Sequence, residues 1–161
     1  MITNEPRITF SLIQTIRGQL EQRALWLYLL MDEARKVGAD PSEWARAAIR
    51  RCGLYQGGEI RAKSPSDSLM HLRRKLFTKG AQWIFEMDVK ASTEDALDVD
   101  FHYCPLVKAW QKIGCSEEEI ATLCETAMCG DAGIAESFGA HLDLGTVIAK
   151  GGDVCQIRFR R

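Results

Sequence analysis

The chain has 161 residues, of which 46% are hydrophobic and 27% charged, and its net charge is -1. A chain of this length buries about 70% of its unfolded surface, so its six cysteines are not needed as a disulfide scaffold. The low net charge and the short basic runs at 73–75 and 158–161 exclude a polyelectrolyte and argue against a nucleic-acid partner. Residues 1–10 contain no unbroken apolar run, so we expect no secretory signal, no membrane span, and free thiols in a reducing cytoplasm.

The first half of the chain is predicted to be helical. Apolar residues recur at steps of three and four from Ile13 to Ala34, which predicts one long amphipathic helix that Gly38 ends. Residues 40–43 supply an N-cap, a first-turn proline and an acid, so a second helix should run to about Gly53. A third helix should begin similarly at residues 64–67 and stop at Gly80.

After residue 80 the spacing of apolar residues falls from 3.6 to 2, which is typical of strands. The segments 82–89 and 96–103 both alternate apolar with polar residues, and the polar turn 92–95 separates them. This pattern predicts an antiparallel pair with one face in water.

A proline corner and a further helix follow this hairpin. Pro105 cannot continue a central strand but suits the first turn of a helix, so the chain should turn at Cys104. Residues 116–119 form a capping box, which predicts another helix that begins there and ends near Met128. This helix should point Cys124 inward.

The last part of the chain is predicted to form a second hairpin. Apolar residues alternate again from Gly139 onward, and the glycines at 151–152 suit a type I′ turn. That turn would pair Ile148 with Cys155 and place Cys155 on the apolar face.

Together these elements predict an α+β fold, in which two antiparallel hairpins form one four-stranded sheet that helices cover on one face. No linker, repeat or low-complexity segment interrupts the chain. We therefore expect a single domain over 1–161, with a helical part at about 1–80 and a sheet-plus-helix part at about 81–161. The apolar stripe from Ile13 to Ala34 can pack inside the domain or join two copies, so a homo-oligomer through the N-terminal helices stays open.

Cys104 has the strongest local argument for chemistry. A thiol at the start of a helix faces unpaired amides and the positive end of the helix dipole, which favour a thiolate and could hold an oxyanion. The alternative is a small buried hydrophobe at a crowded corner. His102 could act as a base for this thiol, although strand alternation places it on the polar face with Asp98 and Asp100.

Three more residues could join Cys104. Asp131 either caps the segment that follows it or acts as a general base near a cysteine-lined cavity. Cys124 and Cys155 would each be packing residues if taken alone, but with Cys104 they could bind zinc or another divalent metal. No two of these three cysteines have the close spacing of a zinc turn, so we expect no cofactor and keep the metal as the alternative.

From Asp100 onward the sequence resembles the L-2-amino-thiazoline-4-carboxylic acid hydrolase family. The resemblance is close over about sixty residues, whereas the helical half shares only the general layout. Its motifs are Tyr103-Cys104-Pro105-Leu106-Val107 with Ala109-Trp110, Ser116-Glu117-Glu118-Glu119-Ile120 leading to Leu123-Cys124, Gly130-Asp131, and Thr146-Val147-Ile148-Ala149 with Gly151-Gly152-Asp153-Val154-Cys155.

The resemblance implies a hydrolase that opens a small cyclic amidine, such as 2-amino-thiazoline-4-carboxylate, to an N-carbamoyl cysteine. The family-like site positions are Cys104, Cys124, Asp131 and Cys155, and not Cys52, Cys115 or Cys129. The neighbouring His102 and Tyr103 are expected to contact the substrate.

These residues leave two mechanisms and one non-enzymatic function open. In the first mechanism Cys104 thiolate attacks the amidine carbon and Asp131 directs the water that releases product. In the second the thiols hold a metal ion and its bound water attacks. The same cysteines could instead serve a sensor domain that binds a small ligand or metal. The expected partner is a small-molecule substrate, without nucleic acid or membrane.

Overall fold

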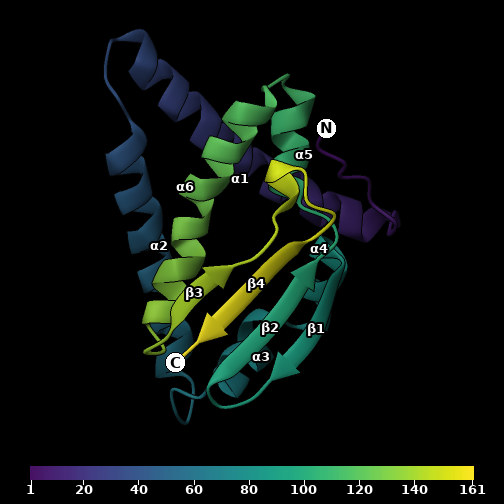
Figure 1. The fold of residues 1–161 in the computed structure, drawn as a ribbon, viewed down its shortest axis with the longest axis vertical. Coiled ribbons are helices and arrows are strands. Elements are labelled where there is room, and N and C mark those ends of the chain that lie inside the picture. Colours follow the sequence, from purple (N-terminus) through teal and green to yellow (C-terminus); the bar gives the residue numbers. More distant parts are fainter.

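The computed structural model describes all 161 residues (Figure 1). The helices are α1 (Ser11–Lys36), α2 (Ser42–Ala62), α3 (Leu69–Leu76), α4 (Lys79–Phe85), α5 (Pro105–Lys112) and α6 (Glu117–Glu136). The strands are β1 (Met87–Ser92), β2 (Ala96–Phe101), β3 (His141–Leu144) and β4 (Cys155–Arg160), and a short 3-10 helix, η1 (Ile148–Lys150), precedes β4. The predicted α+β fold is confirmed.

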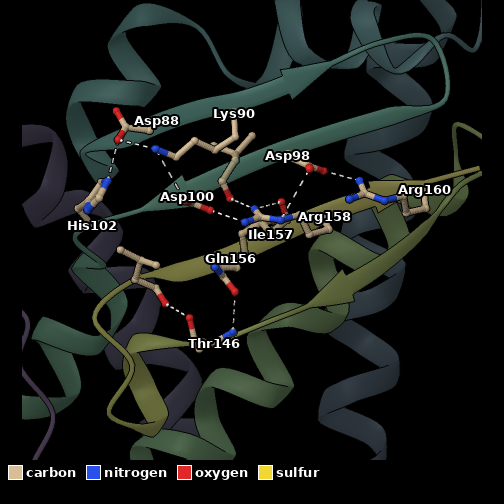
Figure 2. Close-up of polar contacts among 12 residues, drawn as sticks. Asp88, Lys90, Asp98, Asp100, His102, Thr146, Gln156, Ile157, Arg158 and Arg160 are labelled. Carbon is tan, nitrogen blue, oxygen red and sulfur yellow. Dashed lines mark hydrogen bonds and ion pairs between the residues drawn. The ribbon is translucent and has the colours of Figure 1, made fainter.

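The four strands form one antiparallel sheet in the order β1-β2-β4-β3, so the two predicted hairpins meet along β2 and β4. At this junction Leu97 lies opposite Phe159 and Val99 opposite Ile157. All four side chains are buried, because they point to the face that the helices cover. The alternating positions carry mostly charged side chains, which give the sheet its polar outer face (Figure 2).

Helices α2 and α6 lie side by side, as the ribbon shows (Figure 1), and glycines allow them to approach closely. A Cβ added to Gly53 would lie 1.9 Å from the carbonyl oxygen of Gly130, and one added to Gly133 would lie 2.4 Å from that of Arg50. No side chain fits between backbones at these distances, so the contact requires glycine. It fixes the part of α6 that carries Asp131.

The same packing explains two helices that are longer than predicted. α2 does not end near Gly53 but continues to Ala62, and α6 does not end near Met128 but continues to Glu136. Glycine costs a helix about 1 kcal/mol relative to alanine, and tertiary packing outweighs that cost here. Asp131 is consequently an interior residue of α6, and its predicted role as the cap of a new segment is wrong.

The boundary between the third helix and the first strand was also predicted wrongly. Gly80 does not end a helix; it lies in the first turn of α4, where Thr78 caps the helix by accepting a hydrogen bond from the Ala81 amide. The alternating residues at 82–85 are therefore helical, and β1 begins only at Met87. The α4 helix ends at Glu86, which has a left-handed backbone with φ of 52°.

The last hairpin forms, but with another turn and register. The predicted type I′ turn would have paired Leu144 with Phe159, whereas Leu144 pairs with Ile157. β3 ends there, and the chain reaches β4 through η1 instead of a tight turn. Ile148 nevertheless stays near Cys155, because its amide donates a hydrogen bond of 3.3 Å to the cysteine sulfur.

A buried ion pair ties the N-terminal segment to the corner between α4 and β1. Nη2 of Arg17 lies 3.0 Å from Oε1 of Glu86, and both side chains are almost completely buried. Arg17 also donates to the carbonyl oxygen of Ile8, and its guanidinium lies 4.2 Å from the ring centre of Tyr103. The sequence pattern had not indicated this pair, although Arg17 lies inside the predicted first helix.

The buried core is one cluster that runs from Ile2 to Phe159. On α1 the buried side comprises Ile13, Arg17, Ala24 and Met31, and the opposite side exposes Leu12, Trp26 and Leu30. Association of two copies through the N-terminal helices stays a prediction. None of the helices has the length and apolar character needed to span a membrane.

Candidate functional site

A cavity of about 390 Å³ lies between the helices and the covered face of the sheet. Most of its wall is hydrocarbon from α1, α2, α4, α5, α6 and the sheet. Its polar groups are few and lie among these apolar side chains. They are Arg23, Gln56, Asp131 and the thiols of Cys52, Cys104, Cys124 and Cys155.

Cys104 enters this cavity from the corner between β2 and α5, as the residue that precedes Pro105. The buried side chain of Asn4 holds the backbone of Cys104 at both ends. Its Nδ2 donates to the Cys104 carbonyl and its Oδ1 accepts from the Cys104 amide, each at 2.9 Å. Asn4 therefore positions the thiol, and sequence analysis missed it because no local pattern links residues so far apart.

The thiol of Cys104 is neutral at rest, which differs from the predicted thiolate. Burial raises its pKa, and the negative charge of Asp131 adds to this shift. The amides of Leu106 and Val107 lower the pKa, but neither forms a capping hydrogen bond of ordinary geometry with the sulfur, so burial dominates. Cys104 needs a base before it can act as a nucleophile.

Asp131 is the only carboxyl group in the cavity wall and can supply that base. Burial raises its pKa to about 6, while the charge of Arg23 acts in the opposite direction. The carboxylate is therefore mostly ionised at neutral pH and still able to accept a proton. Cys104 and Asp131 both retain some accessible surface, which faces the cavity that they line.

Cys124 from α6 and Cys155 from β4 complete the sulfur-lined wall. Burial raises the pKa of Cys124, and it raises that of Cys155 to about 12 despite the hydrogen bond from the Ile148 amide. A negative charge on Cys104 would raise both pKa values further, and all three sulfurs line the same cavity. The structure thus brings together Cys104, Cys124, Asp131 and Cys155, although they come from three separate segments: the corner before α5, helix α6 and strand β4.

The metal site stays an alternative prediction, and the structure shows no group of side chains already arranged for it. No three or more His, Cys, Asp or Glu side chains in this structure are grouped so that they could hold a metal ion. A zinc site requires its ligands at about 2.0–2.3 Å from one point, so neighbouring sulfurs in a cavity wall are not sufficient.

His102 and Tyr103 lie away from the cavity, so we do not retain them as substrate contacts. Figure 2 shows His102 on the outer face of the sheet, where its Nε2 lies 3.0 Å from Oδ2 of Asp88. Tyr103 is buried under Arg17. Both positions follow from the alternation of the strand, which turns one neighbour of Cys104 outward and the next into the core.

The polar face seen in Figure 2 is a ladder of ion pairs, not a second site. Arg158 lies between Asp98 and Asp100, with Nη2 2.6 Å from Oδ1 of Asp100, and Arg160 pairs with Asp98. These charges satisfy one another across neighbouring strands. The guanidinium groups of Arg158 and Arg160 are therefore already paired.

Arg23 is a cavity residue that sequence analysis missed. It interrupts the apolar stripe of α1 at a position that shares a face with Ile16, Leu20 and Leu27, and all four line the cavity. A charge within an apolar stripe was the available signal.

Fold and site together define a class: a single-sheet α+β domain with an internal, mostly apolar cavity in which one acid and several thiols meet. The sequence comparison makes this specific, because residues 17–159 match the L-2-amino-thiazoline-4-carboxylic acid hydrolase family. The chain belongs to this family, as the resemblance predicted. No curated protein sequence gave a significant match.

A solved structure with a similar fold is that of a trafficking protein particle complex subunit 3 from Naegleria fowleri, covalently bound to palmitic acid. The two chains superpose with a TM-score of 0.53 and are 13% identical, and the match covers 87% of this chain and 93% of the other. At this identity the likeness concerns the fold alone.

Proposed function

We propose that this protein is a hydrolase that opens a small cyclic amidine, with 2-amino-thiazoline-4-carboxylate as the first candidate substrate. The observation that carries the proposal is the meeting of Cys104 and Asp131 in one cavity of a chain that belongs to this family. A nucleophile and a base beside an enclosed space are the minimum that hydrolysis of a stable ring requires.

The charge of the cavity supports an amidine as the reacting group. An amidine is basic and carries a positive charge when protonated, and Asp131 is the one carboxylate in the wall. Its ionised form would attract the amidinium and orient the carbon between ring sulfur and nitrogen toward Cys104. The surrounding hydrocarbon strengthens such a pairing because it lowers the local dielectric.

The proposed reaction has two stages. In the first, Asp131 accepts the proton of Cys104 while the sulfur attacks the amidine carbon, and the ring C–S bond then breaks, with the proton passing to the departing sulfur. In the second, Asp131 takes a proton from water, which attacks the same carbon. The bond to Cys104 breaks, the proton returns to its sulfur, and the product is an N-carbamoyl cysteine. Cys124 and Cys155 would form the wall beside the reacting sulfur.

Turnover of 2-amino-thiazoline-4-carboxylate, followed by chromatography of the N-carbamoyl cysteine product, tests this proposal. Cys104→Ala is expected to lower kcat at least 1000-fold, because the nucleophile is lost, an effect of the size seen for covalent catalysts. Cys129→Ala is the matched control, since Cys129 does not line the cavity. Full turnover by Cys104→Ala would exclude the covalent route, and no turnover by the unmodified protein would exclude this substrate.

A second candidate is the binding of an apolar ligand without catalysis. The mostly hydrocarbon wall favours it, and the protein of similar fold from Naegleria fowleri holds palmitic acid covalently. Calorimetric titration with a fatty acid would test this function. Submicromolar binding by a chain that turns over no cyclic amidine would favour a binding or sensor domain over a hydrolase.

We further propose that the protein works in the cytoplasm without a cofactor. The support is that all six cysteines are free, which suits a reducing compartment, and that the proposed steps need only an acid, a thiol and water.

A further inference from the structure

Arg23 is the only cationic side chain that lines the cavity. It lies on α1, on the same face as Leu20 and Leu27, and it is exposed to solvent. It therefore stands where the cavity meets the solvent, and it shares the cavity wall with Cys104, which precedes α5, and with Asp131 of α6.

The guanidinium of Arg23 has no partner within the protein. It makes no ion pair and no side-chain hydrogen bond, in contrast to Arg17, Arg158 and Arg160, which are all paired. Its charge nevertheless reaches into the cavity, since it lowers the pKa of both Asp131 and Cys104. An arginine with free donors beside an apolar chamber has the properties of an anion anchor.

We propose that Arg23 binds a carboxylate group of the molecule that occupies the cavity and thereby selects acids over neutral analogues. A carboxylate buried among hydrocarbon needs a cationic partner, and the wall offers only this one. Asp131 would repel the same group, so the two charges orient the ligand with its acid toward the mouth and its other end toward Cys104. For the hydrolase this inference rests on the proposed function and adds the specificity residue for 2-amino-thiazoline-4-carboxylate.

Two pairs of probes test the anchor, each an acid with an analogue that lacks its carboxylate. The first pair is 2-amino-thiazoline-4-carboxylate and 2-amino-thiazoline, and the second is dodecanoate and dodecanol. Equilibrium binding is measured by calorimetry on the full chain and on the variants Arg23→Gln, Arg23→Lys and Arg35→Gln. Arg35 is the control, because it is an exposed arginine of the same helix that does not line the cavity.

We expect Arg23→Gln to bind the acid of a pair about 10- to 100-fold more weakly, the range expected for loss of hydrogen bonds to a charged group. Arg23→Lys should weaken binding of the acid less than Arg23→Gln does, because lysine keeps the positive charge but cannot form the bidentate hydrogen bonds of arginine. The analogues without the carboxylate should lose no affinity in the Arg23 variants, and Arg35→Gln should behave as wild type. Which acid binds identifies the source of the carboxylate.

The anchor is overturned if Arg23→Gln weakens binding of the acid and of its analogue without the carboxylate alike, if it weakens neither, or if wild type binds neither acid. Failure of the hydrolase proposal has a different signature. If binding of an acid depends on Arg23 but no turnover is seen, the hydrolase proposal is refuted and the proposed role of Arg23 is supported. If turnover is seen but does not change in Arg23→Gln, the hydrolase proposal is supported and the proposed role of Arg23 is refuted.

Discussion

Substitution of Gly53 by alanine probes the contact between α2 and α6, which positions Asp131. The added Cβ would lie 1.9, 2.7 and 2.9 Å from three backbone atoms of Gly130. Ordinary contact begins near 3.4 Å, so the helices would have to part by about 1.5 Å along this direction. Backbone atoms cannot rotate away as a side chain can, and overpacking of this kind costs about 3 kcal/mol. Alanine stabilises the helix by about 1 kcal/mol through its higher helix propensity, so the free energy of unfolding should fall by about 2 kcal/mol in total.

Gly58→Ala is the matched control, because Gly58 lies in the same helix and a Cβ there would meet nothing within 4 Å. It should gain up to about 1 kcal/mol from helix propensity alone. Urea unfolding followed by circular dichroism measures both variants, and their free energies of unfolding should differ by about 3 kcal/mol. In thermal unfolding Gly53→Ala should lose about 4–8 °C, given about 2–4 °C per kcal/mol at this chain length. If Gly53→Ala proves as stable as Gly58→Ala, the close approach of the two helices is wrong.

Buried polar groups give three further tests. Glu86→Gln leaves the guanidinium of Arg17 buried without a counter-charge, so the free energy of unfolding should fall by about 3 kcal/mol in urea titrations. Asn4→Ala leaves the amide and carbonyl of Cys104 without their partner, so it should cost about 2–3 kcal/mol and lower turnover by displacing the thiol. Asp131→Asn removes a carboxyl group whose charged form is disfavoured by burial, so the variant should be about 1–2 kcal/mol more stable than wild type at pH 7 while losing turnover.

The pH dependence of stability separates the last variant from a simple packing change. The pKa of Asp131 is about 6 in the folded protein and about 3.9 in an unfolded chain, so the folded state binds more protons between these values. Wild type should therefore gain stability from this group as pH falls from 6 to 4, and Asp131→Asn should lack this gain. If the free energies of unfolding of the two proteins change with pH in parallel, the buried position of the Asp131 carboxyl group is contradicted.

A surface variant serves as the control for Glu86→Gln. Glu125→Gln removes an exposed partner of Arg46 and should change stability by less than about 1 kcal/mol. An equal effect of Glu86→Gln would show that its ion pair is not buried. Retained turnover and unchanged stability in Asn4→Ala would show that Asn4 does not hold the proline corner.

Local patterns in the sequence determined the kinds of element and several of their ends. The capping box at Ser116 and Glu119, the proline after Cys104 and the left-handed Gly38 all act within one helical turn. Their effects therefore depend on near neighbours, and the structure agrees with them. Strand alternation likewise placed Cys155 inward and His102 outward, because side chains of a strand alternate whatever lies around them.

Only the tertiary structure decided where helices continue through glycine and which distant residues line the same cavity. Gly53 and Gly130 read locally as helix ends, but each lies inside a helix because the other packs against it. The pKa of Cys104 also depended on the whole fold, since burial by distant segments outweighs the local helix amides. Asn4 reaches the site across a long stretch of chain, and such a contact leaves no period in the sequence.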